Sequence, residues 1–253
     1  MIFDTHAHYD DKAFEEDRAE LLAYMPEKGV GLVLNPGCDV ESSRAALRLA
    51  EAYPHIYAAV GIHPEELGED PFSALEVIKS LARHEKCRAI GEIGLDYYWD
   101  VPRKEEQKAV FDAQLALARE LDLPVIIHDR EAHADSMEIV SRHTDVQGVF
   151  HCYSGSAEMA RELLRRGWYL GFDGPVTYKN ARKALEVLAI TPVDRILIET
   201  DSPYMSPVPM RGKRNDSTNL VYIINKIAEV KGMPPEEIER ITFENGKRLF
   251  RIS

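Results

Sequence analysis

The sequence is poor in cysteine, and it lacks any segment that would suit a membrane. Cys38, Cys87 and Cys152 are the three cysteines, and none belongs to a Cys-x-x-Cys pair. This number and spacing argue against a disulfide framework and against a thiolate zinc site, so we expect reduced, mostly structural thiols. No apolar run approaches the roughly 18 residues that cross a membrane, and no basic and apolar leader precedes Ile2. We expect no membrane association, and a cytoplasmic location is the simplest interpretation.

Positive charge is also scarce. The chain has 31 Lys and Arg residues against 43 Asp and Glu residues, which gives a formal net charge of −12. Broad nonspecific binding of nucleic acid is therefore disfavoured, because it normally requires a basic surface. Any polyanion would have to be held locally. The rest of the composition, with 45% hydrophobic and 29% charged residues, is ordinary for a folded enzyme, and we expect one domain spanning residues 1–253.

Short β-rich runs alternate with amphipathic stretches from end to end. Several runs are continuously apolar, such as Leu32-Val-Leu34 and Ile196-Leu-Ile198, which is typical of parallel strands covered by helices. Strands are expected at Ile2–Asp4, Val30–Asn35, Ile56–Val60, Ala89–Glu92, Pro124–His128, Gly148–His151, Tyr169–Phe172 and Arg195–Glu199. Helices are expected at Asp17–Lys28, Val40–Tyr53, Phe72–His84, Arg103–Leu121, Asp135–His143, Ala157–Arg166, Asn180–Ala189 and Thr218–Lys231.

Eight such βα units of roughly 20 to 35 residues predict an α/β fold, a (β/α)8 TIM barrel. A further helical tail is expected at Pro234–Phe250. It would pack on the outside of the barrel.

Six metal-competent side chains fall where the predicted strands run into loops. In such barrels the functional site lies at the carboxyl ends of the strands. His6 and His8 follow the first strand, and both imidazoles can point at one ion because residues two apart in a strand share a face. The other four groups would have to converge on them: Glu92, His128, His151 and Asp201. A set this rich in nitrogen suits zinc, manganese, iron, nickel or cobalt, whereas a site for magnesium alone would hold more oxygen.

Two residues near this set admit two interpretations each. His63 follows the third strand and either binds substrate or is a hydrogen-bonded loop histidine. Arg130 follows His128 by two residues and can clamp a phosphate or carboxylate in a bidentate manner. Its alternative is a salt bridge to Asp129 or Glu131.

The remaining candidates lie in loops or beside the ligands. The segment Arg211-Gly-Lys-Arg214 either holds a polyanion or is a solvated turn. Cys152 is either a small core residue or a ligand, and Glu199 is interpreted as a hydrogen-bond partner of a neighbouring ligand. Glu92 stands between glycines, which would leave room for a ligand or a second ion. The alternative there is a β-bulge with an incidental carboxylate.

The same residues carry a family resemblance. It rests on the segments Phe3-Asp-Thr-His-Ala-His8, Gly61-Ile-His-Pro64, Gly91-Glu-Ile-Gly-Leu-Asp-Tyr97, Pro124-Val-Ile-Ile-His128, His151-Cys-Tyr-Ser-Gly155, Glu199-Thr-Asp-Ser-Pro203 and Arg211-Gly-Lys-Arg-Asn215. In this order, and over nearly the whole chain, they resemble the TatD family of metal-dependent hydrolases, within the amidohydrolase-like barrels. One departure is visible after Asn215, where the family tends to have Glu-Pro and this chain has Asp216-Ser217.

The resemblance implies a (β/α)8 fold, a divalent metal centre and phosphodiesterase activity on DNA. Carried over by position, it implies that Glu92 bridges two ions, of zinc, manganese or magnesium. The full ligand set would be His6, His8, Glu92, His128, His151 and Asp201.

We therefore expect a deoxyribonuclease in which the metals activate a water molecule. Asp201 would accept the proton of that water, with Glu92 as the second catalytic carboxylate, while His63 and Arg130 position the phosphate and Arg211 and Arg214 hold the DNA. The sequence leaves exo- and endonuclease action open, with 3′–5′ action on single strands as one form. A monomer is favoured.

Two other functions remain in view. The same groups would polarise an amide or lactone carbonyl, so an amidohydrolase acting on a small cyclic amide, ester or lactone is the alternative enzyme. A binding protein that holds metal without turnover belongs to a different class.

Overall fold

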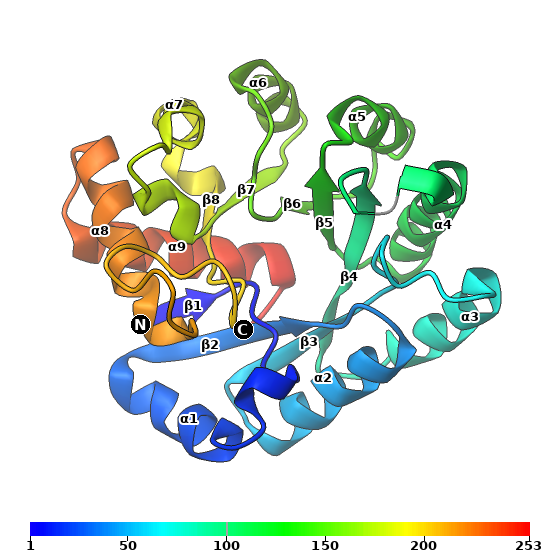
Figure 1. Ribbon diagram of the computed structural model, residues 1–253, viewed down its shortest axis with the longest axis horizontal. Coiled ribbons are helices and arrows are strands. Elements are labelled where there is room, and N and C mark those ends of the chain that lie inside the picture. Colours follow the sequence, from blue (N-terminus) through cyan, green and yellow to red (C-terminus); the bar gives the residue numbers. More distant parts are fainter. Residues whose placement is uncertain (100) are drawn as a thin grey trace.

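The computed structural model describes residues 1–99 and 101–253, and its strands form a parallel eight-stranded barrel (Figure 1). The strands follow one another around the barrel in chain order, as a (β/α)8 fold requires. Their bounds are β1 Ile2–Asp4, β2 Val30–Pro36, β3 Ile56–Val60, β4 Cys87–Asp96, β5 Val125–Arg130, β6 Gly148–Phe150, β7 Tyr169–Phe172 and β8 Ile196–Ile198. The predicted fold class is confirmed.

Helices alternate with the strands and surround the barrel (Figure 1). The outer helices are α1 Arg18–Tyr24, α2 Val40–Ala52, α3 Pro71–Leu81, α4 Lys104–Leu121, α5 His133–Arg142, α6 Ala157–Arg165, α7 Arg182–Ile190 and α8 Leu220–Lys231. The predicted helix Asp17–Lys28 is shorter than expected, because Pro26 has no N–H to continue the ladder and residues Met25–Lys28 form a 3-10 turn. Within the described residues, no helix has the length and apolar character needed to cross a membrane.

The last helix, α9 Pro235–Phe250, closes one end of the barrel instead of packing on its outside. A core cluster takes one side chain from each of the eight strands, and Leu249, Phe250 and Ile252 belong to it. Phe3 of β1 meets Phe250 edge to face, with ring centroids 6.0 Å apart. Figure 1 shows α9, in red, inside the ring formed by the other helices. The expected outside position is therefore wrong.

The seam between β8 and β1 is closed by loop hydrogen bonds. The backbone N–H of Asp201 donates to the carbonyl of His6 at 2.9 Å, and that of His8 donates to the carbonyl of Ser202 at 2.8 Å. Asp201 thus lies beside His6 and His8, although nearly 200 residues separate it from them in sequence.

Two predicted strand ends are wrong. β4 continues to Asp96 and β5 to Arg130, so Glu92 and His128 lie within their strands and not at the ends. The register between β4 and β5 shifts between Ile90 and Ile93, an interval that includes Glu92, which is the bulge considered as an alternative.

The glycines around Glu92 serve the packing of β4 on β5. A Cβ on Gly91 would lie 2.7 Å from the Cβ of Ile126. A Cβ on Gly94, whose φ is +143°, would lie 1.9 Å from the carbonyl oxygen of His128. The space beside these glycines is therefore filled by the neighbouring strand, and the expectation that it admits a ligand is wrong.

Candidate metal centre

Glu92 lies at the centre of a group of imidazoles in the mouth of the barrel. Its Oε2 atom is 3.3 Å from His6 Nε2 and 3.6 Å from His8 Nε2. Its Oε1 atom is 2.8 Å from His151 Nε2 and 3.0 Å from His128 Nδ1. The two carboxylate oxygens therefore face two different pairs of histidines.

Asp201 completes the set on the side of the first pair. Its Oδ1 atom is 3.7 Å from His6 Nε2 and 3.6 Å from His8 Nε2. The expected convergence of the six side chains is confirmed. Two of the triads they form have ligand atoms that all lie within 4.8 Å of one another, and these are His6 with His8 and Glu92, and Glu92 with His128 and His151.

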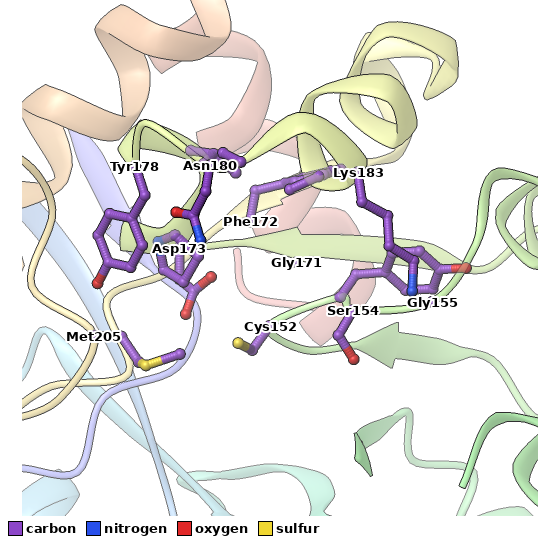
Figure 2. A pocket seen from close by; sticks show the side chains of 15 residues that line it. Cys152, Ser154, Gly155, Gly171, Phe172, Asp173, Tyr178, Asn180, Lys183 and Met205 are labelled. Carbon is purple, nitrogen blue, oxygen red and sulfur yellow. The ribbon is translucent and has the colours of Figure 1, made fainter. Parts of the chain in front are cut away.

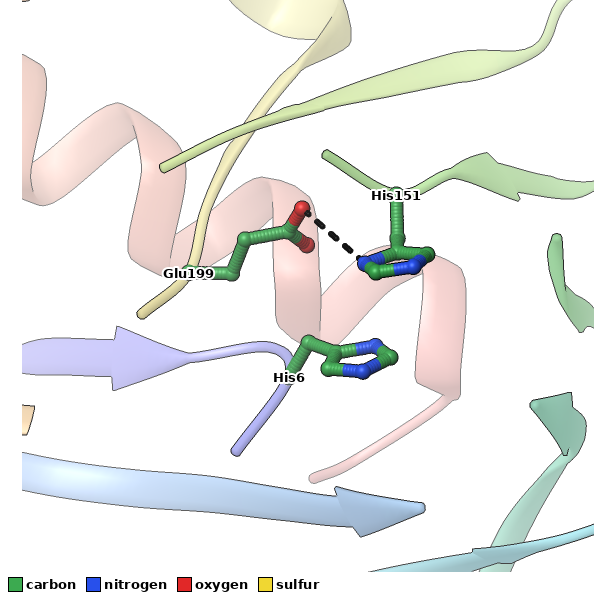
Figure 3. A group of neighbouring side chains, drawn as sticks. All are labelled: His6, His151 and Glu199. Carbon is green, nitrogen blue, oxygen red and sulfur yellow. Dashed lines mark ion pairs between the residues drawn. The ribbon is translucent and has the colours of Figure 1, made fainter. Parts of the chain in front are cut away.

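The rings of His6 and His151 stack within this group. Their rings are nearly parallel, with centroids 4.0 Å apart and an interplanar angle of 7° (Figure 3). The Nδ1 atoms of both rings are buried, and neither has a hydrogen-bond partner in the described part of the chain. Burying unpaired imidazole nitrogens costs free energy. The Nε2 atoms of these rings face Glu92, and the donor set of several imidazoles and two carboxylates fits divalent transition metals.

Burial and neighbouring charges shift the pKa values of His151, His128 and Glu92 in opposite directions. Burial resists protonation of His151, yet the Glu92 carboxylate raises its pKa to about 10. Burial acts in the same way on His128, but hydrogen bonds to Asp96 and Glu92 raise its pKa to about 9. Burial would raise the pKa of Glu92, but the charges of His151 and His6 hold it well below its usual value. Without a cation, the imidazoles of His128 and His151 therefore carry protons that balance the buried carboxylate, whereas burial and the charge of His151 hold the pKa of His6 well below its usual value.

Asp96 contacts a proposed ligand and was not among the candidates selected from the sequence. Its Oδ2 atom is 2.9 Å from His128 Nε2, and its Oδ1 atom accepts hydrogen bonds from the backbone N–H groups of Tyr98 and Trp99 at 2.8 and 2.9 Å. A carboxylate in this position orients the imidazole and fixes its tautomer. One signal was present, because residues four apart in a strand share a face, and Asp96 follows Glu92 by four.

His63 lies within the group of imidazoles. Its Nε2 atom is 3.5 Å from Glu92 Oε1, and its ring centroid is 4.4 Å from that of His128. Together with Glu65 and His128 it forms a further set of possible ligands. Its Nδ1 atom accepts a hydrogen bond from the backbone N–H of Glu65 at 3.2 Å, so His63 is a hydrogen-bonded loop histidine whose Nε2 atom faces the site.

Glu199 lies beside His151, on the side of its Nδ1 atom. Its Oε1 atom accepts a hydrogen bond from the backbone N–H of Cys152 at 2.5 Å and lies 3.7 Å from His151 Nδ1 (Figure 3). Burial raises the pKa of Glu199 to about 8. The thiol of Cys152 is free, and among the described residues no candidate metal group includes it.

A cavity of about 320 Å³ lies beside the loop that follows His151. It is lined by loops that follow β6, β7 and β8, with Cys152, Asp173, Tyr178 and Met205 among the lining residues. Figure 2 shows the Asp173 carboxylate between Tyr178 and Cys152. This carboxylate is buried, which raises its pKa to about 7, and its Oδ2 atom has no hydrogen-bond partner in the described part of the chain. Among its lining residues, Cys152 is the chain neighbour of a proposed ligand, His151.

Arg130 stacks on aromatic rings. Its guanidinium carbon is 4.3 Å from the ring centroid of Tyr98 and 5.6 Å from that of Trp99. The carboxylate of Asp129 is occupied instead by His133, whose Nδ1 lies 2.8 Å from Asp129 Oδ2. Across the described residues, no ion pair joins Arg130 to a flanking carboxylate. The edge of its guanidinium is thus available to an anion.

The two predicted arginines after β8 differ in their contacts. Arg214 forms a bidentate ion pair with Asp17, at 2.7 and 2.5 Å, and also donates to the carbonyl oxygen of Ala13. These contacts tie the loop to the start of α1 and support a structural role. Arg211 lies over the ring of Tyr178, at 4.3 Å from its centroid, which places it at the edge of the cavity.

The departure at Asp216-Ser217 has a structural explanation. Asp216 Oδ1 accepts a hydrogen bond from the backbone N–H of Thr218 at 2.9 Å, and so caps the turn before α8. The Ser217 hydroxyl donates to the buried carboxylate of Asp4 at 2.6 Å. Both residues therefore fix this loop without entering the group of imidazoles.

Comparison with known proteins places these features in a family. The model of the family described as "TatD related DNase" matches residues 3–251. A Bacillus subtilis protein named "Uncharacterized metal-dependent hydrolase YabD" is 46% identical, with both chains covered completely. A Citrobacter rodentium protein named "3'-5' ssDNA/RNA exonuclease TatD" is 34% identical, over 100% of this chain and 98% of that protein.

Solved structures agree. The crystal structure of the TatD homologue YJJV from Escherichia coli superposes with a TM-score of 0.93 at 34% identity, covering 100% of this chain and 98% of the other. The family match spans every residue of the group around Glu92. The chain therefore belongs to the TatD-related DNase family, and it is a metal-dependent hydrolase of that family.

Proposed function

We propose that this hydrolase is a deoxyribonuclease that removes nucleotides from single-stranded DNA in the 3′–5′ direction, with two divalent ions that share Glu92. The observation that carries the proposal is the division of the Glu92 carboxylate, with one oxygen facing His6 and His8 and the other facing His128 and His151. Six ligands exceed what one tetrahedral ion needs. The name of the Citrobacter relative, a 3′–5′ exonuclease of single-stranded DNA and RNA, supports the same substrate class.

The residues of the chain have distinct roles in this proposal. Bound divalent ions would supply a lowered pKa for water and would neutralise charge on the phosphate. Asp201 accepts the proton of the attacking water, because its side chain is 18% exposed while those of Glu92 and Glu199 are 5% and 0% exposed. It can therefore pass the proton on to solvent. His63 and Arg130 position the phosphate from the β3 and β5 sides of the site.

Metal uptake by the stripped protein should release protons. The imidazoles of His151 and His128 have pKa values raised to about 10 and about 9, so at pH 7 both hold a proton that a metal must displace. Apparent metal affinity should therefore fall as the pH is lowered through neutrality. Calorimetric titration with Zn²⁺ in buffers of different ionisation enthalpy measures the proton count. A count of zero at pH 7 would contradict this charge arrangement.

Arg211 and Arg214 should give different results when each is replaced by alanine. Arg211→Ala should raise the KM for an oligonucleotide several-fold and leave the hydrolysis of a nitrophenyl phosphodiester unchanged, because that small substrate does not reach the loop. Arg214→Ala removes the ion pair with Asp17 and should mainly lower thermal stability. The two steady-state assays, with melting curves for both variants, separate these roles. Equal effects of Arg211→Ala on both substrates would remove it from DNA binding.

The proposed substrate class is tested by parallel assays of the metal-loaded protein. A 5′-labelled single-stranded DNA oligonucleotide should be shortened from its 3′ end, with mononucleotides as the product, while a panel of cyclic amides, esters and lactones should not be turned over. The Glu92→Gln variant is the matched control for a contaminating nuclease. Turnover of the panel without cleavage of the oligonucleotide would replace the proposal by the amidohydrolase alternative.

A further inference from the structure

Two large aromatic side chains are exposed beside the metal centre. Tyr98 is 54% exposed and Trp99 is 62% exposed, and both lie in the loop directly after β4. Their rings meet edge to face, with centroids 4.6 Å apart, and the guanidinium of Arg130 stacks on the ring of Tyr98. We call Tyr98, Trp99 and Arg130 the aromatic platform. Adjacent exposed aromatic rings at the mouth of a functional site indicate a surface that a ligand covers.

One carboxylate connects the platform to the metal centre. Asp96 Oδ1 accepts hydrogen bonds from the backbone N–H groups of both Tyr98 and Trp99, and its Oδ2 atom is 2.9 Å from His128 Nε2. The turn that carries the two rings is therefore fixed by the same group that orients a proposed ligand. A ligand held on the platform would keep a defined position relative to the reacting atoms.

Arg130, the third member of the platform, belongs to the same strand as His128. Arg130 follows His128 by two residues in β5, so both side chains leave the same face of that strand. The spacing places Arg130 about 7 Å further toward the mouth of the barrel. The platform thus lies on the side of β4 and β5, beyond His128 along β5 and next to Asp96 at the end of β4.

The negative net charge of the protein favours a ligand that binds the platform by stacking and not by charge. A net charge of −12 gives a polyanion little long-range attraction. Stacking of nucleobases on aromatic rings needs no positive field, and it tolerates any base because every base has a π face. In a duplex the faces of the bases are covered by their neighbours, so a platform of this kind selects single strands.

We propose that the aromatic platform stacks a nucleobase of a single-stranded substrate and so places the adjoining phosphodiester at the metal centre. This rests on the proposed nuclease function and identifies what binds the part of the strand that is not being cleaved. Tyr98 and Trp99 are positioning residues in this role, because they contact a base and not the reacting phosphate.

The kinetic test compares substitutions in the protein with removal of bases from the substrate. The double variant Tyr98→Ala/Trp99→Ala should raise the KM for a single-stranded oligonucleotide about tenfold or more, with little change in kcat. Hydrolysis of a nitrophenyl phosphodiester should be unchanged, and Tyr98→Phe/Trp99→Phe should restore the KM because the rings return. Phe72→Ala is the control, since Phe72 is 51% exposed on α3.

Abasic oligonucleotides locate the stacked base. For the wild-type enzyme, an abasic site at one position of the oligonucleotide should raise KM about as much as the double substitution does. For the double variant, the same abasic site should raise KM no further. The proposal would be overturned if the effects of the abasic site and the double substitution on KM added up. It would also be overturned if the double substitution impaired hydrolysis of the nitrophenyl phosphodiester equally, and the rings would then have a structural role.

A binding measurement separates this proposal from the nuclease function. The chain has two tryptophans, Trp99 and Trp168, and Trp168 is 2% exposed, so a stacked base should quench mainly the fluorescence of Trp99. In the metal-loaded Asp201→Asn protein, a single-stranded oligonucleotide should quench this emission. Trp99→Phe, or an oligonucleotide made entirely abasic, should abolish the quenching. Quenching without cleavage by the wild-type enzyme would refute the nuclease function and keep the platform, whereas cleavage without quenching would refute the platform alone.

Discussion

Replacing Glu92 by glutamine is expected to lower the kcat for oligonucleotide hydrolysis by at least about 10³-fold. The substitution keeps the volume of the side chain and removes the charge that both pairs of histidines face. The glutamine amide offers one oxygen and one NH2 group, so it cannot present oxygens to both pairs. We expect the bound metal to fall below that of the wild-type protein in the same preparation. Steady-state kinetics and elemental analysis measure the two effects.

The fold should survive this change. Glu92 lies in the mouth of the barrel, whereas the core layer that α9 closes is built from other side chains of the strands. Far-ultraviolet circular dichroism should therefore be unchanged. Glu120→Gln serves as the control, because it removes an exposed carboxylate of α4 that pairs with Lys79. Activity of Glu92→Gln within tenfold of the control would remove Glu92 from its central role.

Asp201→Asn should lower kcat by a similar factor for a different reason. It removes the proposed proton acceptor while the imidazoles of the second pair, His128 and His151, keep their places around Glu92. Asparagine is the informative replacement, because Asp201 has a left-handed backbone with φ +55°, which asparagine also tolerates. The turn that donates its N–H to His6 should therefore remain.

A pH–rate profile separates the two roles of Asp201. Loss of a proton acceptor should flatten the acidic limb of kcat, whereas loss of a ligand alone should be reversed by more metal. Asp194→Asn is the matched control, since Asp194 is exposed and lies at the opposite end of β8. Recovery of full kcat at high metal concentration would show that Asp201 binds metal and accepts no proton.

The fold and the proposed ligands could be predicted from the sequence for physical reasons. Parallel strands buried on both faces are continuously apolar, and each chemical group followed such a run, as Asp201 follows Ile196-Leu-Ile198. The ends of β4 and β5 were not accessible, because residues such as Asp96 and Arg130 are polar and extend the strands only through pairing with one another. Their pairing is a tertiary effect that overrides local propensity.

Contacts between segments that are distant in sequence could not be predicted either. The ion pair of Arg214 with Asp17 joins residues 197 positions apart, and a single sequence contains no sign of it. The apolar face of α9 was visible as a helical pattern, but the pattern does not say what that face covers. Asp96 could have been found by its spacing from Glu92. The Asp173 carboxylate in the cavity could also have been found, because it directly follows the predicted strand Tyr169–Phe172.

The most direct test of the account is a titration of metal-stripped protein with a divalent ion, Zn²⁺, Mn²⁺ or Mg²⁺, during hydrolysis of a single-stranded DNA oligonucleotide. The account predicts no cleavage without metal and full activity only when elemental analysis finds two ions per chain. Full activity with at most one ion bound, after saturation, would contradict the shared role of Glu92 on which the proposal depends.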